Sequence, residues 1–195
     1  ANPAGQEPAA TAEQVSAYFD GFLDAIVDAE SYKTLAQSST VVKIGKASLQ
    51  ILREGAINAE YIRQLSTVRI LFVCTGNTCR SPMAEAACKK HFCDILGCSV
   101  DELPRFGYIV KSAGVAAMTG MPASEHAVQV CRQHNIPLEE HKSAFLTPQQ
   151  VDESDRIFVM GNGHRQGIVE FYPDAAEKCI MLDESRDIAD PIGQG

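Results

Sequence analysis

The segment at residues 74–81, which reads CTGNTCRS, constrains this chain more than any other feature. It follows an apolar, strand-like run at 68–73 and precedes a helix-like run that opens at Pro82. A strand, a short loop and a helix in this order place the cysteine beside the unpaired N–H groups and the positive dipole end of a helix N-terminus. The sequence therefore predicts a loop that wraps around an anion, with Cys74 as a nucleophile against it.

The residues within the loop suit that arrangement. Arg80 provides a planar guanidinium that can bind two phosphate oxygens at once. Gly76 and Asn77 are predicted to take the positive φ angles that a tight loop needs. Ser81 is predicted as the helix N-cap, with the following proline as the first helical residue. The alternative, in which Cys74 merely ends a buried strand, leaves the agreement between spacing and helix start unexplained.

The same features favour the thiolate form of the cysteine over the thiol. The helix N-terminus and the nearby Arg80 are both electropositive, and Ser81 is placed to donate a hydrogen bond to the sulfur of Cys74. A thiolate is the reactive form of cysteine, so we expect nucleophilic chemistry at this position.

The composition narrows the class of protein. The 195 residues carry a formal net charge of −8, and no basic stripe is present that would give non-specific nucleic-acid binding. Nothing resembles a signal peptide, and no apolar run approaches the ~18 residues of a membrane span, so no membrane association is expected. The seven cysteines are irregularly spaced. We therefore expect free thiols in a reducing cytoplasm rather than disulfides or a zinc site.

From residue 68 onward, strand-like and helix-like segments alternate. This alternation predicts an α/β fold in which a parallel four-stranded sheet has helices on both faces. Ligands of such sheets bind beyond the carboxyl ends of the strands, which is where Cys74 would lie. The predicted strands lie near 68–73, 107–112, 156–160 and 178–182, and the predicted helices near 82–95, 123–134, 148–153 and 162–171.

Residues 1–66 follow a different pattern. Thr11 is predicted to cap an amphipathic helix that runs to about Glu30. Two strand-like runs and a short helical run follow, at 39–44, 48–52 and 58–65. These elements make a poor core alone, so we expect part of an α+β domain. The sequence thus predicts two domains, at 1–66 and 67–195.

Residues 67–195 resemble the low-molecular-weight protein phosphatases. Beyond the loop, the matching segments are SAG at 112–114, PAS at 122–124, HKS at 141–143, FVM at 158–160 followed by His164, and Asp190-Pro191. A Cys-to-Arg loop together with a downstream Asp-Pro pair is a specific combination of motifs. The resemblance implies the family's fold, a phosphorylated protein as substrate, and no metal or cofactor.

The resemblance also implies a covalent mechanism in two steps. Cys74 attacks phosphorus while Arg80 holds the phosphoryl oxygens, and Asp190 protonates the leaving group. An ordinary Asp-Pro pair marks only a turn, so this acid role depends on the resemblance. Ser112 and His141 would support the loop by hydrogen bonds. Phosphate binding is assigned to the loop as a whole: Thr75, Gly76, Asn77, Thr78, Cys79, Arg80 and Ser81.

Two departures from the tyrosine-directed members bear on the substrate. Those members have Ile or Leu where this loop has Thr78, and they have aromatic residues soon after the Asp-Pro pair. Here the pair is followed by IGQG at 192–195. The threonine resembles the bacterial protein-arginine phosphatases, and a hydroxyl can accept a guanidinium hydrogen bond where a methyl group cannot. We therefore expect phosphoarginine to be preferred over phosphotyrosine.

The remaining cysteines leave two alternatives. By resemblance, Cys79 would form a reversible disulfide with Cys74 that protects the nucleophile, or it is only a small buried side chain.

The related thioredoxin-linked arsenate reductases need two further, closely spaced cysteines as a relay. Cys131 and Cys179 are far apart along this chain, so arsenate reduction is the less favoured activity.

Residues 1–66 resemble the C-terminal end of a YrdC-type threonylcarbamoyl-AMP synthase domain. The matching segments are ANPAG at 1–5, STVV at 39–42 and ILREGAI at 51–57. By resemblance, Asn2, Ser39 and Arg53 would contact the nucleotide. The alternative function is therefore threonylcarbamoyladenylate synthesis for tRNA modification, with ATP and threonine as ligands only if the full domain is present.

Both ends of the sequence bear on this expectation. The basic Lys/Arg motif of the synthase family is absent, and the chain stops soon after Asp190. We expect a fragment of a fused protein, in which the synthase domain is partial and the phosphatase domain lacks its last helix.

Overall fold

The computed structural model describes residues 5–6, 9–28, 38–45 and 49–191. The chain divides into two units, residues 1–65 and 66–195. The second unit contains the Cys-to-Arg loop.

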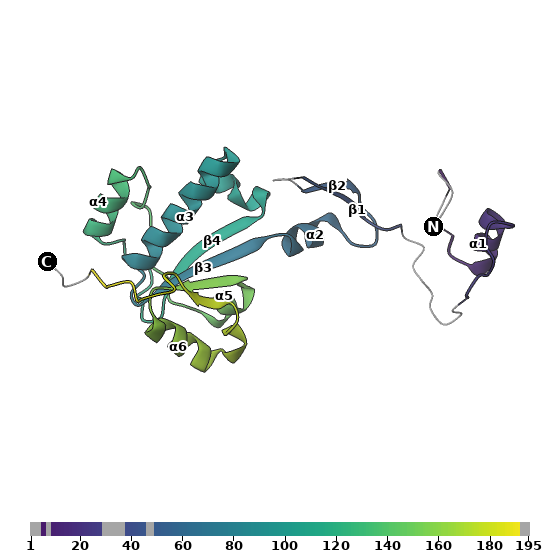
Figure 1. Cartoon of the computed structure of the whole chain (residues 1–195). Coiled ribbons are helices and arrows are strands. Elements are labelled where there is room, and N and C mark those ends of the chain that lie inside the picture. Colours follow the sequence, from purple (N-terminus) through teal and green to yellow (C-terminus); the bar gives the residue numbers. More distant parts are fainter. Residues whose placement is uncertain (1–4, 7–8, 29–37, 46–48, 192–195) are drawn as a thin grey trace. The chain divides into compact units, whose positions relative to one another are not determined.

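A parallel four-stranded sheet forms the centre of the second unit, as the alternating pattern predicts. Its order is β4-β3-β5-β6, so β3 lies between two neighbours (Figure 1). Cys74 is the last residue of β3 and pairs in register with Gly114 at the end of β4. The loop that follows therefore starts from the middle of the carboxyl edge. The strands are β3 (Val68–Cys74), β4 (Tyr108–Gly114), β5 (Arg156–Val159) and β6 (Cys179–Met181).

Helices cover both faces of this sheet (Figure 1). The α-helices are α3 (Arg80–Leu96), α4 (Glu125–Gln133), α5 (Pro148–Glu153) and α6 (Asn162–Phe171), and two 3₁₀ helices are η1 (Val100–Phe106) and η2 (Pro173–Ala175). The four α-helices match the predicted segments, whereas the two 3₁₀ helices have no counterpart in the prediction.

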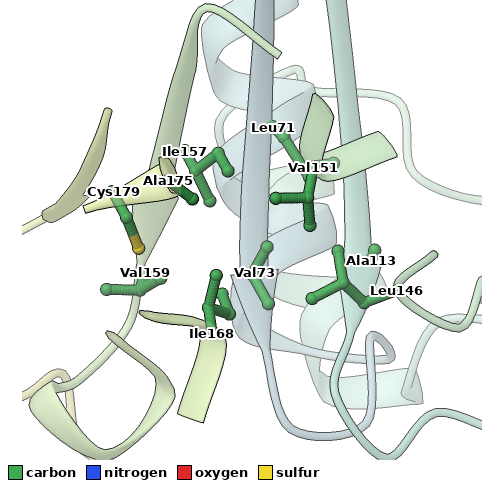
Figure 2. Packing of buried hydrophobic residues seen from close by; sticks show 10 residues of the cluster. All are labelled: Leu71, Val73, Ala113, Leu146, Val151, Ile157, Val159, Ile168, Ala175 and Cys179. Atoms are coloured by element: carbon green, nitrogen blue, oxygen red, sulfur yellow. The ribbon is translucent and has the colours of Figure 1, made fainter. Parts of the chain in front are cut away.

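The core is built by the alternation of side chains along β3. Leu71 and Val73 point to one face, where they pack with residues of α5 and α6 (Figure 2). Phe72 and Cys74 point to the other face, which packs against α3. All four are at most 5% exposed. Burial on both faces is typical of a central parallel strand, and it fixes the position from which the loop departs.

The start of α3 differs from the prediction. The helix begins at Arg80 with Cys79 in the N-cap position, so the prediction of Ser81 as N-cap was wrong. The physical reason is that the Ser81 hydroxyl lies against the Cys74 sulfur and the Asn77 side chain instead of the helix N–H groups. Pro82 is then the third helical residue, still within the first turn where a missing N–H leaves no bond unmade.

The first unit contains short elements. The strands β1 (Val41–Ile44) and β2 (Leu49–Arg53) pair antiparallel, and α2 (Ala59–Leu65) follows, close to the predicted positions. The helix α1 (Ala12–Phe19) is capped by Thr11, as predicted. It does not run on toward Glu30, because the chain turns at Asp20 and Gly21, the latter with φ +77°; Glu30 itself is outside the described residues.

Candidate active site

Cys74 lies at the base of the loop, 2% exposed. The Ser81 hydroxyl oxygen is 3.0 Å from its sulfur, which confirms the predicted contact. The backbone N–H of Asn77 also points at the sulfur, at 3.3 Å. The sulfur thus lies within the loop with one N–H and one hydroxyl group against it, as a nucleophile at the base of an anion-binding loop requires.

Asn77 is the centre of the network that holds the loop. It is fully buried and has φ +53°, the left-handed conformation predicted for it. Its side-chain amide donates to Ser81 at 2.9 Å and to Ser112 at 2.8 Å. Its side-chain oxygen accepts the N–H of Ala144 at 2.7 Å, and its backbone carbonyl is 2.8 Å from His141 Nε2. Ser112 and His141 are therefore both brought to the loop.

Gly76 does not share the left-handed conformation predicted for it, since its φ is not positive. The glycine that the loop requires is Gly114 on the neighbouring strand. A Cβ atom there would lie 2.5 Å from the Thr75 carbonyl oxygen and 2.9 Å from the Asn77 nitrogen. The SAG segment thus supplies both a hydroxyl for the network and the space in which the loop lies.

The network continues to a residue that the sequence analysis missed. The Ser112 hydroxyl donates to the carboxylate of Glu85 on α3, and Glu85 pairs with Lys89 one turn further. Ser112, Glu85 and Lys89 line a surface groove of about 530 Å³, which His141 also lines. Glu85 follows Arg80 by little more than one helical turn, but nothing in that spacing indicates that it would reach β4.

Arg80 and Asp190 meet across the loop. One guanidinium nitrogen of Arg80 donates to the Asp190 carboxylate, and the other donates to the Ile188 carbonyl at 3.2 Å. Ile188 is in turn fixed by a 2.8 Å bond from its N–H to the Met160 carbonyl at the end of β5. The Asp-Pro segment is thereby placed at the carboxyl edge of the sheet, beside the loop.

A second side-chain pair lies at the rim of the loop. The Thr75 hydroxyl oxygen is 2.9 Å from Nε2 of His164, near the start of α6, and 3.4 Å from the guanidinium of Arg80. Nδ1 of His164 is buried and has no hydrogen-bond partner among the described residues. Burial, followed by the charge of Arg80, lowers the pKa of His164.

The two middle residues of the loop differ in their surroundings. Thr78 is half-buried, and its hydroxyl has no hydrogen-bond partner in the described part of the chain. Cys79 is 6% exposed and packs in an apolar cluster with Cys131 and Leu138. All seven cysteines are free. This placement agrees with the reading of Cys79 as a small buried side chain, and its reversible disulfide stays a prediction.

The residues assigned to a nucleotide lie in the first unit. The Arg53 guanidinium donates to the Ser39 carbonyl at 2.9 and 3.2 Å and reaches its hydroxyl at 3.5 Å, so these two are neighbours. Asn2 is outside the described residues.

The described chain contains no group of three or more His, Cys, Asp or Glu side chains arranged to hold a metal ion. Among the same residues, no helix is long and apolar enough to cross a membrane.

A buried thiol that accepts the Asn77 N–H, together with the Arg80 guanidinium and the Asp190 carboxylate that pair across the same loop, defines a cysteine-based phosphoryl-transfer site. A sequence model of the family described as low molecular weight phosphotyrosine protein phosphatase matches residues 69–195. The chain belongs to this family and is a cysteine-dependent protein phosphatase.

Relatives within the family include enzymes named for two different phosphoresidues. A protein-arginine-phosphatase from Geobacillus stearothermophilus is 42% identical over 130 residues, 64% of this chain and 79% of that protein. A probable low molecular weight protein-tyrosine-phosphatase, EpsP, from Ralstonia solanacearum is 39% identical over 63% of this chain and 77% of its own.

Solved structures show the same fold. The structure of the YwlE arginine phosphatase from Geobacillus stearothermophilus matches with a TM-score of 0.54 at 41% identity, over 65% of this chain and 77% of that one. A cysteine-to-serine mutant of a YwlE arginine phosphatase, solved with a phosphorylated active-site serine, matches with a TM-score of 0.56 at 35% identity, over 65% of this chain and 80% of that one.

Proposed function

We propose that residues 67–195 hydrolyse phosphoarginine in proteins in preference to phosphotyrosine. The observation that carries the proposal is the Thr78 hydroxyl, which has no hydrogen-bond partner among the described residues and lies in the loop itself. It is therefore available to a substrate group that donates hydrogen bonds, as the guanidino N–H groups of phosphoarginine do. The similarity to proteins named as arginine phosphatases supports the same choice.

In the first step, the Cys74 thiolate attacks phosphorus in line with the bond to the leaving group. Arg80 and the loop N–H groups bind the non-bridging oxygens, where negative charge must be stabilised. The P–N bond of phosphoarginine breaks, and Asp190 gives its proton to the departing guanidino nitrogen. The products of this step are a phosphocysteine at Cys74, a free arginine side chain and an Asp190 carboxylate.

In the second step, water attacks the phosphocysteine. Asp190 accepts the proton of the water as the new P–O bond forms and the P–S bond breaks. Inorganic phosphate leaves, and the Cys74 thiolate and the protonated Asp190 are restored. The Asn77 N–H, 3.3 Å from the sulfur, stabilises the thiolate as the leaving group of this step, and the Ser81 hydroxyl, with its oxygen 3.0 Å from the sulfur, is placed to turn its proton toward it.

The proposal is tested by comparing kcat/KM on two peptides of one sequence, one with phosphoarginine and one with phosphotyrosine. The wild type should prefer phosphoarginine, and Thr78→Ile should shift the preference toward phosphotyrosine, because the methyl groups replace a polar contact with apolar surface. Thr78→Ser is the matched control that keeps the hydroxyl. An unchanged preference in Thr78→Ile would contradict the role of Thr78.

We infer that residues 1–66 are the C-terminal part of a YrdC-like domain. The contact between Arg53 and Ser39 supports this inference, because it joins two of the three residues assigned to the nucleotide. The C-terminal part of such a domain should not by itself form threonylcarbamoyladenylate. Formation of that adenylate from ATP, threonine and bicarbonate by the purified chain would refute the inference. We also infer that the protein is cytoplasmic, because its seven cysteines are free and cytoplasmic proteins rarely form disulfides.

A further inference from the structure

The Thr75 side chain contacts residues of two helices, His164 of α6 and Arg80 of α3. His164 Nε2 lies 2.9 Å from its hydroxyl oxygen, and the Arg80 guanidinium lies 3.4 Å from the same atom. Thr75 is exposed at the mouth of the site, whereas the Arg80 side chain is only 11% exposed. The contact between Thr75 and His164 has no part in the two chemical steps proposed above, and it lies outside the hydrogen-bond network around Asn77.

The tautomer of His164 determines which atom donates. Its Nδ1 is buried and without a partner in the described chain. A buried N–H without an acceptor is rarer and more costly than a buried lone pair without a donor. The proton of the neutral ring therefore belongs on Nε2, which donates to the Thr75 oxygen. With Arg80 donating as well, both lone pairs of that oxygen are occupied, and its own proton points elsewhere.

The contacts of Arg80 place Thr75 beside the leaving group. The guanidinium nitrogen that reaches the Thr75 oxygen is the same one that binds the Asp190 carboxylate. Asp190 must approach the leaving-group atom to protonate it, so Thr75 lies on that side of the phosphorus. A substrate phosphate that binds Arg80 replaces the contact between Arg80 and Thr75. One lone pair of the Thr75 oxygen is then free to accept another hydrogen bond.

We propose that Thr75 is a second specificity residue, which accepts a hydrogen bond from the guanidino N–H groups of phosphoarginine while His164 holds its side chain in position. This inference rests on the proposed phosphoarginine activity. The Thr75 proton is then free to donate to a phosphoryl oxygen. An aryl phosphate has no N–H group next to phosphorus, so it gains only the second of these two contacts. Removal of the Thr75 hydroxyl should therefore lower kcat/KM more for phosphoarginine than for an aryl phosphate.

The experiment measures kcat/KM for a phosphoarginine peptide and for para-nitrophenyl phosphate, and it follows their ratio. Thr75→Val keeps the side-chain shape and removes the hydroxyl. Both activities should fall, since Thr75 is part of the loop, but the ratio should fall about tenfold or more, the size expected for a hydrogen bond to a charged group. Thr75→Ser, which keeps the hydroxyl, should retain most of the wild-type ratio.

His164 is tested as a positioning residue by His164→Phe and His164→Gln. The Phe variant removes the donor, so it should lower the ratio in the same direction as Thr75→Val. The effects should be non-additive in the double variant, because both changes break one contact. The Gln variant supplies an amide N–H and should restore part of the ratio.

Each outcome bears on the proposal. An equal loss of both activities in Thr75→Val would reduce Thr75 to a loop-shaping residue and overturn it. A phosphoarginine preference that responds to Thr78→Ile but not to Thr75→Val would overturn it and leave the proposed function intact. A wild type that prefers phosphotyrosine over phosphoarginine would overturn both.

Discussion

Arg80 binds Asp190 through one guanidinium nitrogen, although the two residues are far apart along the chain. Asp190 is 41% exposed, so the pair is screened by water and contributes little to stability. Its consequence is functional. A substrate phosphate competes with Asp190 for Arg80. The displaced carboxylate takes up a proton from water and then serves as the acid beside the leaving group.

Replacing Asp190 by Asn should lower kcat on phosphoarginine by about 10²–10⁴-fold, the range for loss of a general acid. The loss should be smaller for para-nitrophenyl phosphate, whose leaving group departs without full protonation. Steady-state kinetics on both substrates measure this difference. Asp183→Asn is the matched control. Asp183 is a partly exposed acid of the same C-terminal segment, and hydrogen bonds from Ser185, with Arg186, lower its pKa to about 2. An equal loss on both substrates would contradict the acid role of Asp190.

Gly114→Ala should disrupt the loop, because the new Cβ would lie 2.5 Å from the Thr75 carbonyl oxygen. A clash with backbone cannot be relieved by a side-chain rotation, so both activity and thermal stability should fall. In Gly167→Ala, in contrast, the new Cβ has no neighbour within 4 Å, and the change should stabilise α6 by about 0.5–1 kcal/mol. Thermal unfolding of the two variants checks the prediction, and equal behaviour would refute it.

Ser112→Ala tests the loop supports. The change removes the acceptor of the Asn77 amide and the donor to Glu85, both within a largely buried network. We expect a loss of about 1–3 kcal/mol in the free energy of unfolding, together with lower kcat, because unpaired buried groups carry that cost. Ser16→Ala, at an exposed position on α1, is the control and should leave kcat unchanged and change the free energy of unfolding by no more than about 0.5 kcal/mol. Retention of full stability by Ser112→Ala would argue against the network.

Local patterns predicted most of the phosphatase unit. The strand, loop and helix around Cys74 are determined by neighbours in sequence, and the parallel sheet follows from the alternation of elements. The predicted start of α3 was wrong because of a tertiary contact. Serine is a good N-cap residue, but the Ser81 hydroxyl lies against the Cys74 sulfur and does not cap the helix. Likewise, the apolar periodicity after Phe19 favours a longer helix, and the turn at Gly21 overrides it.

The contacts that sequence reasoning missed join distant segments. His164 reaches Thr75 across 89 residues, and Ser112 reaches Glu85 across 27. Each of these residues is ordinary for its own element, so no local spacing indicates the pair. The fold brings them together because the carboxyl ends of β3, β4 and β5 meet at one edge of the sheet.

The pH dependence of stability should carry a contribution from His164. Burial and Arg80 lower its pKa, while Asp187 and Asp190 oppose that effect. The unfolded chain, with an ordinary histidine pKa of about 6.5, therefore binds the proton at higher pH than the folded protein does. The contribution is fully present above about pH 6.5 and is lost as pH falls toward the lowered folded-state value. Urea unfolding at several pH values should show a shallower loss in His164→Phe, and an identical pH profile would contradict this.

The most direct test of the central claim is the detection of a phosphocysteine at Cys74. Asp190→Asn should accumulate it with para-nitrophenyl phosphate, because that substrate needs little acid assistance in the first step while the second step lacks its base. Acid quenching and mass spectrometry of the peptide that spans the loop should find one phosphoryl group on Cys74, and none in Asp190→Asn combined with Cys74→Ala. The absence of a phosphoenzyme, its location on another residue, or full hydrolysis by Cys74→Ala would contradict the account.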